Sequence, residues 1–219
     1  MIKLSFRHCT TTILDKKFGL RRTFSSQLLD QWLTDEQPIT EAEMVNLETH
    51  QEDLRINYDA WNKQELAINF IGPVISKIRF WEPYRYNFFA GRHISIQLDS
   101  LMDTEKVELG GEPDGMIATG YREPEVPIFA FTEYKKEVDS SGDPAGQTVA
   151  AMLVAQQLNQ QEIPIYGCYV IGQNWYFVVL EGKHYTISQS YSAIDDDLFT
   201  IFRILKSLKA VVLAYTAQI

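Results

Sequence analysis

The sequence predicts an α/β protein whose mixed β-sheet is flanked by helices. Residues 127–135 and 165–171 are apolar strands, and Asp143 followed by Pro144 starts a helix between them that runs to about residue 159. A strand, helix, strand order needs a crossover and indicates parallel neighbours. Residues 115–118 and 127–135 are joined by a segment with glycine and prolines, which predicts an antiparallel hairpin and therefore a mixed sheet.

The N-terminal segment, residues 1–58, is predicted to be a small helical appendage. Residues 25–33 form a short amphipathic helix, and Thr40 with Glu43 fits a capping box that starts a second helix reaching about Arg55. Packing, substrate gating and partner contact are all open as its role. Residues 59–219 are predicted to form the α/β core with a C-terminal helix.

The core begins with a helical region over residues 59–79 that Pro73 should kink or divide. Residues 80–93 are rich in aromatic side chains, which indicates either core packing with a loop or a surface on which single-stranded bases stack. Residues 93–100 alternate apolar and polar and are interpreted as the first core strand. The tail from Ser192 carries an apolar stripe at helical spacing, which suits a helix that covers the sheet or forms a homodimer surface.

Charge argues against a general duplex-DNA surface. The 219 residues carry a formal net charge of −9, whereas nucleic-acid affinity comes largely from Lys and Arg that neutralise phosphates. A local basic patch, from Arg85 and Arg92 or from Lys135 and Lys136, would be needed. Otherwise a basic protein partner supplies the contacts, or the substrate is not duplex DNA.

Other sequence signals are negative. No run approaches the roughly 20 apolar residues of a membrane span, and the N-terminus lacks a signal-peptide pattern, so no membrane partner and a cytoplasmic location are expected. The two cysteines, Cys9 and Cys168, have no zinc or disulfide spacing.

The chemistry-bearing residues gather at the predicted hairpin. If its strands pair, Asp114 lies near the Glu133 end, and Glu133 and Lys135 share one strand face with Phe129 and Phe131. Two carboxylates, with the main-chain carbonyl of Tyr134, can hold Mg²⁺ or Mn²⁺. Such an ion activates water and neutralises phosphoryl charge, while Lys135 orients the water or stabilises charge.

A surface ion pair at a strand end is the alternative interpretation. Glu-x-Lys occurs a second time, at Glu181 and Lys183, in a predicted turn without an upstream partner acid. The second copy is interpreted as a solvated turn.

At these residues the chain resembles the PD-(D/E)xK nuclease superfamily, with the restriction-endonuclease-like fold. Pro113-Asp114 matches the first half of the motif and Glu133-Tyr134-Lys135 the second. The resemblance is to the nuclease part of type I restriction subunits and covers roughly residues 60–180. It implies a Mg²⁺-dependent endonuclease that acts on DNA.

The same resemblance implies two supporting site residues. Glu65 matches an acidic residue in the helix before the first core strand, and Gln147 matches a glutamine on the helix after the Glu-x-Lys strand. One departure is clear, because Ala151 stands where relatives with a Gln-x-x-x-Tyr pattern carry tyrosine. A catalytically silent nuclease-like fold that binds or assembles proteins is therefore the second hypothesis, and an unrelated α/β protein is the third.

Overall fold

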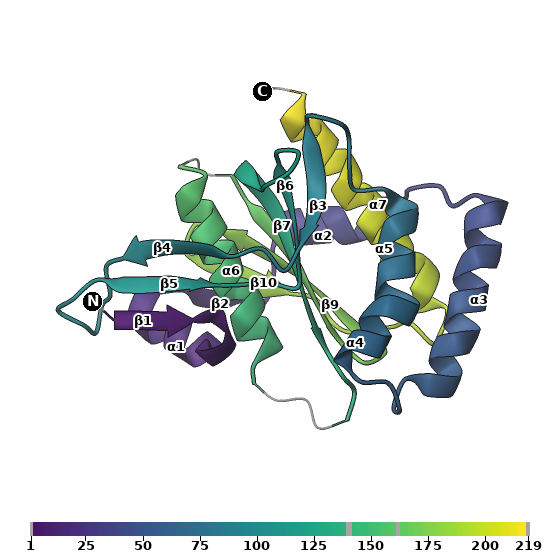
Figure 1. Ribbon diagram of the computed structural model, residues 1–219, viewed down its shortest axis with the longest axis horizontal. Coiled ribbons are helices and arrows are strands. Elements are labelled where there is room, and N and C mark those ends of the chain that lie inside the picture. The colour runs from purple at the N-terminus through teal and green to yellow at the C-terminus, as the bar shows by residue number, and fades with distance from the viewer. Residues whose placement is uncertain (1, 139–141, 161–162, 218–219) are drawn as a thin grey trace.

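Two β-sheets and the helices around them make up the protein (Figure 1). The computed structural model describes residues 2–138, 142–160 and 163–217. The strands are β1 (Ile2–Ser5), β2 (Arg21–Thr23), β3 (Tyr86–Ala90), β4 (Ile94–Leu98), β5 (Val107–Gly111), β6 (Gly115–Thr119), β7 (Glu125–Lys135), β8 (Ile165–Ile171), β9 (Asn174–Glu181), β10 (His184–Ile187) and β11 (Tyr191–Ser192).

The helices surround the sheets on both sides. They are a 3₁₀ turn (Phe6–His8), α1 (Thr11–Phe18), α2 (Gln27–Thr34), α3 (Glu41–Asn57), α4 (Lys63–Leu66), a π-helical turn (Ala67–Ile71), α5 (Gly72–Ile78), α6 (Pro144–Leu158) and α7 (Asp197–Thr216). None of the helices in the described part of the chain is both long and apolar enough to cross a membrane.

The main sheet is mixed, as predicted. Its strand order is β2-β10-β9-β8-β7-β6-β3, with β11 paired to β9. The β7–β8 and β10–β2 pairs are parallel and the other pairs are antiparallel. The smaller sheet has the order β1-β5-β4.

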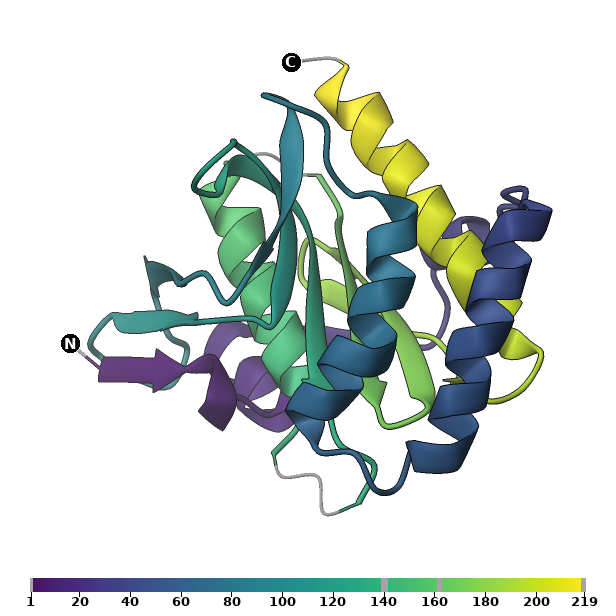
Figure 2. The ribbon, with the colours of Figure 1, turned by 45° about the vertical axis from the view of Figure 1, so that its right-hand side comes forward.

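Two buried clusters lie on opposite sides of the main sheet. One joins α6 and α1 to the small sheet, and the other joins the sheet to α2, α5 and α7. Figure 1 and Figure 2 show α6 on one side, and α7 and α5 on the other with α3 outside them. The prediction of an α/β protein with a mixed sheet flanked by helices is therefore confirmed.

The segments that position the candidate site agree closely with the sequence prediction. Strands β6 and β7 form the antiparallel hairpin, and β7, α6 and β8 form the parallel crossover. Asp143 caps α6, because its Oδ1 accepts a hydrogen bond from the Gly146 N–H at 2.9 Å. These elements bring the C-terminal end of β7 beside the N-terminal end of α6.

One detail of β7 differs from simple alternation. The β6–β7 register shifts after Ile117, which pairs with Ala130 while Ala118 pairs with Ile128. Phe129 is thus an extra residue, and a bulge of this kind changes which face the following side chains occupy. Phe129 consequently packs in the α7-side cluster, whereas Phe131 packs in the α6-side cluster.

Residues 1–58 do not form a separate helical appendage. β1 pairs with β5 and β2 pairs with β10, so both sheets use strands from this segment. In α2, Trp32 is buried and its Nε1–H donates to the Ile204 carbonyl of α7 at 2.9 Å. These strands are three or four residues long, and such short segments have too few positions to show a period of two.

Two smaller expectations are corrected and a third holds. Residues 94–98 belong to the small sheet rather than starting the main one. The C-terminal helix begins at Asp197, after the short strand β11 occupies Tyr191–Ser192. Pro73 does divide the region around it, since α5 follows the π-helical turn and carries Pro73 in its first turn.

Candidate functional site

The hairpin brings Asp114 to the Glu133 end of β7. Gly115 pairs with Thr132 in antiparallel register, so Asp114, one residue earlier, reaches the strand just beyond that pair. Its Oδ2 accepts a hydrogen bond from the Tyr134 N–H at 2.7 Å. A charged acceptor makes this a strong hydrogen bond, and it fixes one carboxylate oxygen against the backbone of β7.

Glu133, Lys135 and Gln147 form a connected polar network. The Lys135 Nζ lies 3.0 Å from Glu133 Oε1 and donates to Gln147 Oε1 at 3.2 Å. Glu133 and Gln147 are both buried, and the Lys135 side chain is 16% exposed. Gln147 is in the first turn of α6, so the crossover helix holds the lysine from one side while β7 holds it from the other.

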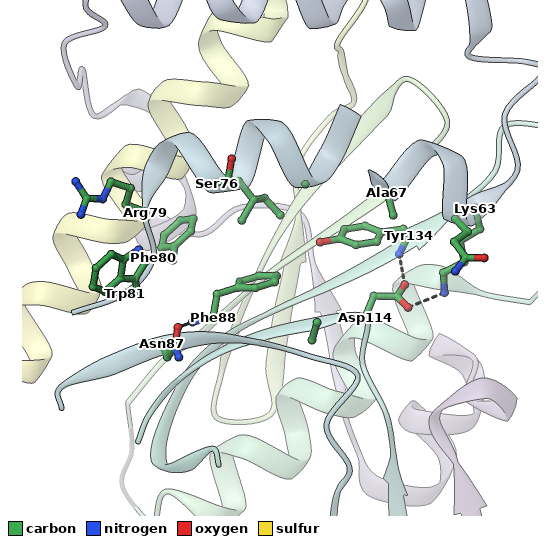
Figure 3. A pocket seen from close by; sticks show the side chains of 14 residues that line it. Lys63, Ala67, Ser76, Arg79, Phe80, Trp81, Asn87, Phe88, Asp114 and Tyr134 are labelled. Atoms are coloured by element: carbon green, nitrogen blue, oxygen red, sulfur yellow. Dashed lines mark hydrogen bonds and ion pairs between the residues drawn. The ribbon is translucent and has the colours of Figure 1, made fainter. Parts of the chain in front are cut away.

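Lys63 is the residue that sequence reasoning missed. Its Nζ lies 2.7 Å from Asp114 Oδ1 and 3.8 Å from Glu133 Oε1, so one ammonium group contacts both carboxylates. Figure 3 shows Lys63 above Asp114, with the Tyr134 hydrogen bond beside it. The acids therefore already share a cation.

Glu65 has a different role from the one that the resemblance implied. Its carboxylate accepts from the Asn62 N–H at 2.8 Å, and Asn62 caps the Glu65 N–H, which together form a capping box. Glu65 is thus engaged at the start of α4. The Asn62-x-x-Glu65 pattern is a recognisable helix start signal, and Lys63 is the first residue inside that helix.

Burial raises the pKa of Glu133, and the nearby Asp114 raises it further, while Lys63 and Lys135 act in the opposite direction. The net shift is upward because removing a carboxylate from water disfavours its charged form. A cation placed between the two acids would lower this pKa again. The site is therefore one in which proton binding and cation binding compete.

The donor set suits a divalent ion that keeps several of its waters. Within residues 2–138, 142–160 and 163–217, no group of three His, Cys, Asp or Glu side chains could hold a metal. Asp114 and Glu133 are two carboxylates, and Mg²⁺ is commonly held by one or two carboxylates with water completing its shell. The N–H and C=O of a strand residue point to the same side, so the Tyr134 carbonyl faces the Asp114 edge, where its N–H is bonded. These oxygens fit the ion.

A polar cavity of about 630 Å³ adjoins these groups. Asp114, Glu133, Lys135 and Gln147 line it together with residues that the sequence did not predict, namely Lys63, Glu112, Gly142, Ser5, Phe6, Arg7 and His8. Arg7 and His8 come from the N-terminal 3₁₀ turn. No local signal marks them, because pairing of β1 with β5 brings them to the site.

The comparisons with known proteins place the chain in no family. No protein-family model matches it, and no curated protein matches it. The fold and the site define an α/β protein with a mixed sheet, in which two acids and two lysines meet at a polar cavity.

Proposed function

We propose that this chain is a Mg²⁺- or Mn²⁺-dependent nuclease of the restriction-endonuclease-like fold, which hydrolyses phosphodiester bonds in DNA. The observation that carries the proposal is the convergence of Asp114, Glu133 and Lys135 at one polar cavity. Gln147, from the helix after β7, contacts Lys135. The motif resemblance implies that Asp114, Glu133 and Lys135 act at one site, and the β6–β7 register brings Asp114 to the end of β7 that carries the other two.

Asp114, Glu133 and the Tyr134 carbonyl would hold the ion. When bound, it supplies an acidified water and charge neutralisation at the phosphoryl group. Lys135 is held by Glu133 and Gln147, so its ammonium group is positioned before substrate arrives. A preorganised donor of this kind stabilises charge that develops on phosphoryl oxygens. The Tyr134 N–H keeps Asp114 oriented during the reaction.

The local charge around the cavity supports an anionic substrate once the ion is bound. Among the lining residues, Arg7, Lys63 and Lys135 are three cations, and Glu112, Asp114 and Glu133 are three acids, so the side-chain charges cancel. A divalent ion adds two positive charges to this balance. The cavity then attracts phosphate even though the whole chain carries a charge of −9.

The test is cleavage of labelled single-stranded and duplex oligonucleotides with Mg²⁺, Mn²⁺ or EDTA. Asp114→Asn, Glu133→Gln and Lys135→Ala are each expected to lower the rate by about 100-fold or more, the usual scale for losing a preorganised transition-state contact. The chain offers a matched control, because Glu181 and Lys183 have the same spacing outside this cavity.

Glu181→Gln with Lys183→Ala should cleave within about twofold of wild type, as expected for surface substitutions. Metal-dependent cleavage that survives all three site substitutions would show that the activity comes from elsewhere. No cleavage by wild type with any ion and either substrate would reject the nuclease proposal.

The contact of Lys63 with both acids favours a second candidate, a catalytically silent module that binds protein. An internal ammonium can satisfy the two carboxylates without a metal, as a structural ion pair would. Titration calorimetry with Mn²⁺ separates the two functions. Heat of binding that Asp114→Asn abolishes supports the nuclease, whereas no binding by wild type at millimolar Mn²⁺ supports the silent module.

A further inference from the structure

A second cavity, of about 700 Å³, leads away from the candidate site. It lies between the α4–α5 segment and strand β3, as Figure 3 shows. Lys63 and Asp114 line both this groove and the polar cavity. The groove therefore begins where the proposed reaction site ends, and a chain bound in one reaches the other.

The groove is mostly apolar and aromatic, with the Lys63–Asp114 ion pair at one end and a cation at the other. Ile75, Phe80 and Phe88 form part of its walls, and Lys63 stands at the end near the site. At the other end, the Arg79 guanidinium lies over the Trp81 ring, 5.1 Å from its centroid. Trp81 is 48% exposed.

The backbone conformation at Arg79 places Arg79 and Trp81 at the far end of the groove. Arg79 has a φ of 57°, in the left-handed region that non-glycine residues adopt at a cost. It ends α5, and its N–H donates to the Ser76 carbonyl at 3.2 Å. The turn sends Phe80 into the core and leaves Trp81 outside, so aromatic surface and a charge lie together at the mouth of the groove.

We infer that this groove binds unstacked bases of single-stranded DNA and guides that strand to Asp114 and Glu133. Surfaces for single strands combine aromatic platforms with cations that follow the backbone, and the groove has both. Its volume lies in the range of small-ligand sites, which suits nucleotides and not a stacked duplex. The net charge of −9 also argues against the broad positive surface that duplex binding uses. This inference rests on the proposed nuclease function and names its substrate.

Binding can be measured apart from cleavage. The probe is a fluorescein-labelled oligo(dT) strand of about 15 nucleotides, near the upper site size of single-strand binders, in low salt with EDTA to prevent hydrolysis. The comparison probe is a duplex of the same length. Fluorescence anisotropy gives both dissociation constants, and wild type is expected to bind the single strand more tightly.

The decisive variant is Arg79→Ala with Trp81→Ala, which removes the far end of the groove. We expect single-strand binding to weaken by about tenfold or more, since stacking on one aromatic ring and one cation are lost together. Phe88→Leu, which keeps an apolar wall without the ring, is expected to weaken it less. Circular dichroism melting establishes that both variants fold.

The chain again supplies a matched control. The Arg22 guanidinium lies over the Phe24 ring, 5.4 Å from its centroid, and Phe24 is 90% exposed. Arg22 lies in β2 and Phe24 directly follows that strand, and β2 and β3 are the opposite edges of the main sheet. Arg22→Ala with Phe24→Ala removes the same chemical groups and should leave the dissociation constant unchanged.

The outcomes separate this inference from the proposed nuclease function. Equal affinity of wild type and the Arg79/Trp81 variant, or duplex binding as tight as single-strand binding, overturns the groove assignment even if the protein cleaves DNA. Loss of binding in that variant alone supports the groove, even if no cleavage is found with any metal. Absence of oligonucleotide binding, with an apolar peptide changing the tryptophan fluorescence of wild type but not of the Arg79/Trp81 variant, overturns it in favour of a protein partner.

Discussion

Replacing Lys63 with glutamine should tighten metal binding. The Lys63 ammonium lies 2.7 Å from Asp114 Oδ1 and 3.8 Å from Glu133 Oε1, so a divalent ion must displace it from both acids. The lysine side chain is 44% exposed, which screens the pair. We therefore assign the displaced contact about 1 kcal/mol, the upper value for a largely solvated ion pair.

A free energy of about 1 kcal/mol corresponds to about a fivefold change in affinity. Mn²⁺ titration calorimetry at fixed pH and low salt is the assay, with wild type, Lys63→Gln and Lys106→Gln. Lys106 pairs with Asp99 at 3.9 Å in an exposed contact away from the site, so its variant matches the change in net charge.

The expected result is a dissociation constant about fivefold lower for Lys63→Gln, following the same conversion, and unchanged for Lys106→Gln. Weaker binding in Lys63→Gln would refute the reasoning, because Lys63 would then support the ion rather than compete with it. Equal tightening in both variants would reduce the effect to net charge.

Two further predictions concern the same region. The raised pKa of Glu133 means that the folded protein holds this proton more tightly than the unfolded chain, whose reference value is 4.5. The stability that this proton contributes is present below the unfolded pKa and is lost as pH rises through the folded pKa. The melting temperature of Glu133→Gln should therefore rise relative to that of wild type between pH 4 and pH 8. A melting-temperature difference that does not change with pH contradicts this prediction. Gly115→Ala should lower the free energy of unfolding in urea by about 1–3 kcal/mol, an overpacking cost, because its Cβ would clash with the Phe88 ring and lie 2.7 Å from Thr132 Oγ1. Wild-type stability of this variant would show that Phe88 moves freely into the groove.

Much of the site's framework follows from local sequence. The hairpin from Gly115 to Lys135 and the crossover through α6 rest on alternation, turn residues and a capping aspartate, all of which are readable within a few positions. The convergence of Asp114 with Glu133 then follows from antiparallel register alone.

The rest depends on contacts that no local pattern contains. Lys63 reaches Asp114 although about 50 positions separate them, while Glu65 closes the capping box of α4. Arg7 reaches the cavity through a parallel pairing between distant short strands. The bulge at Phe129 likewise shows only in the register with β6.

The parallel pairing of β2 with β10 limits the order in which parts of the protein can fold during synthesis. Strand β2 pairs in the main sheet with β10, which belongs to a hairpin more than 150 positions further along the chain. Thr11 also has a partner far along the chain, since its N–H donates to Asp143 Oδ2 at 2.9 Å. During synthesis, the segment that carries Arg7 and His8 emerges before β5, the strand that β1 pairs with, so it docks only after residues 107–111 have emerged. The cavity wall that this segment forms is therefore completed only after β5 and Asp143 have emerged.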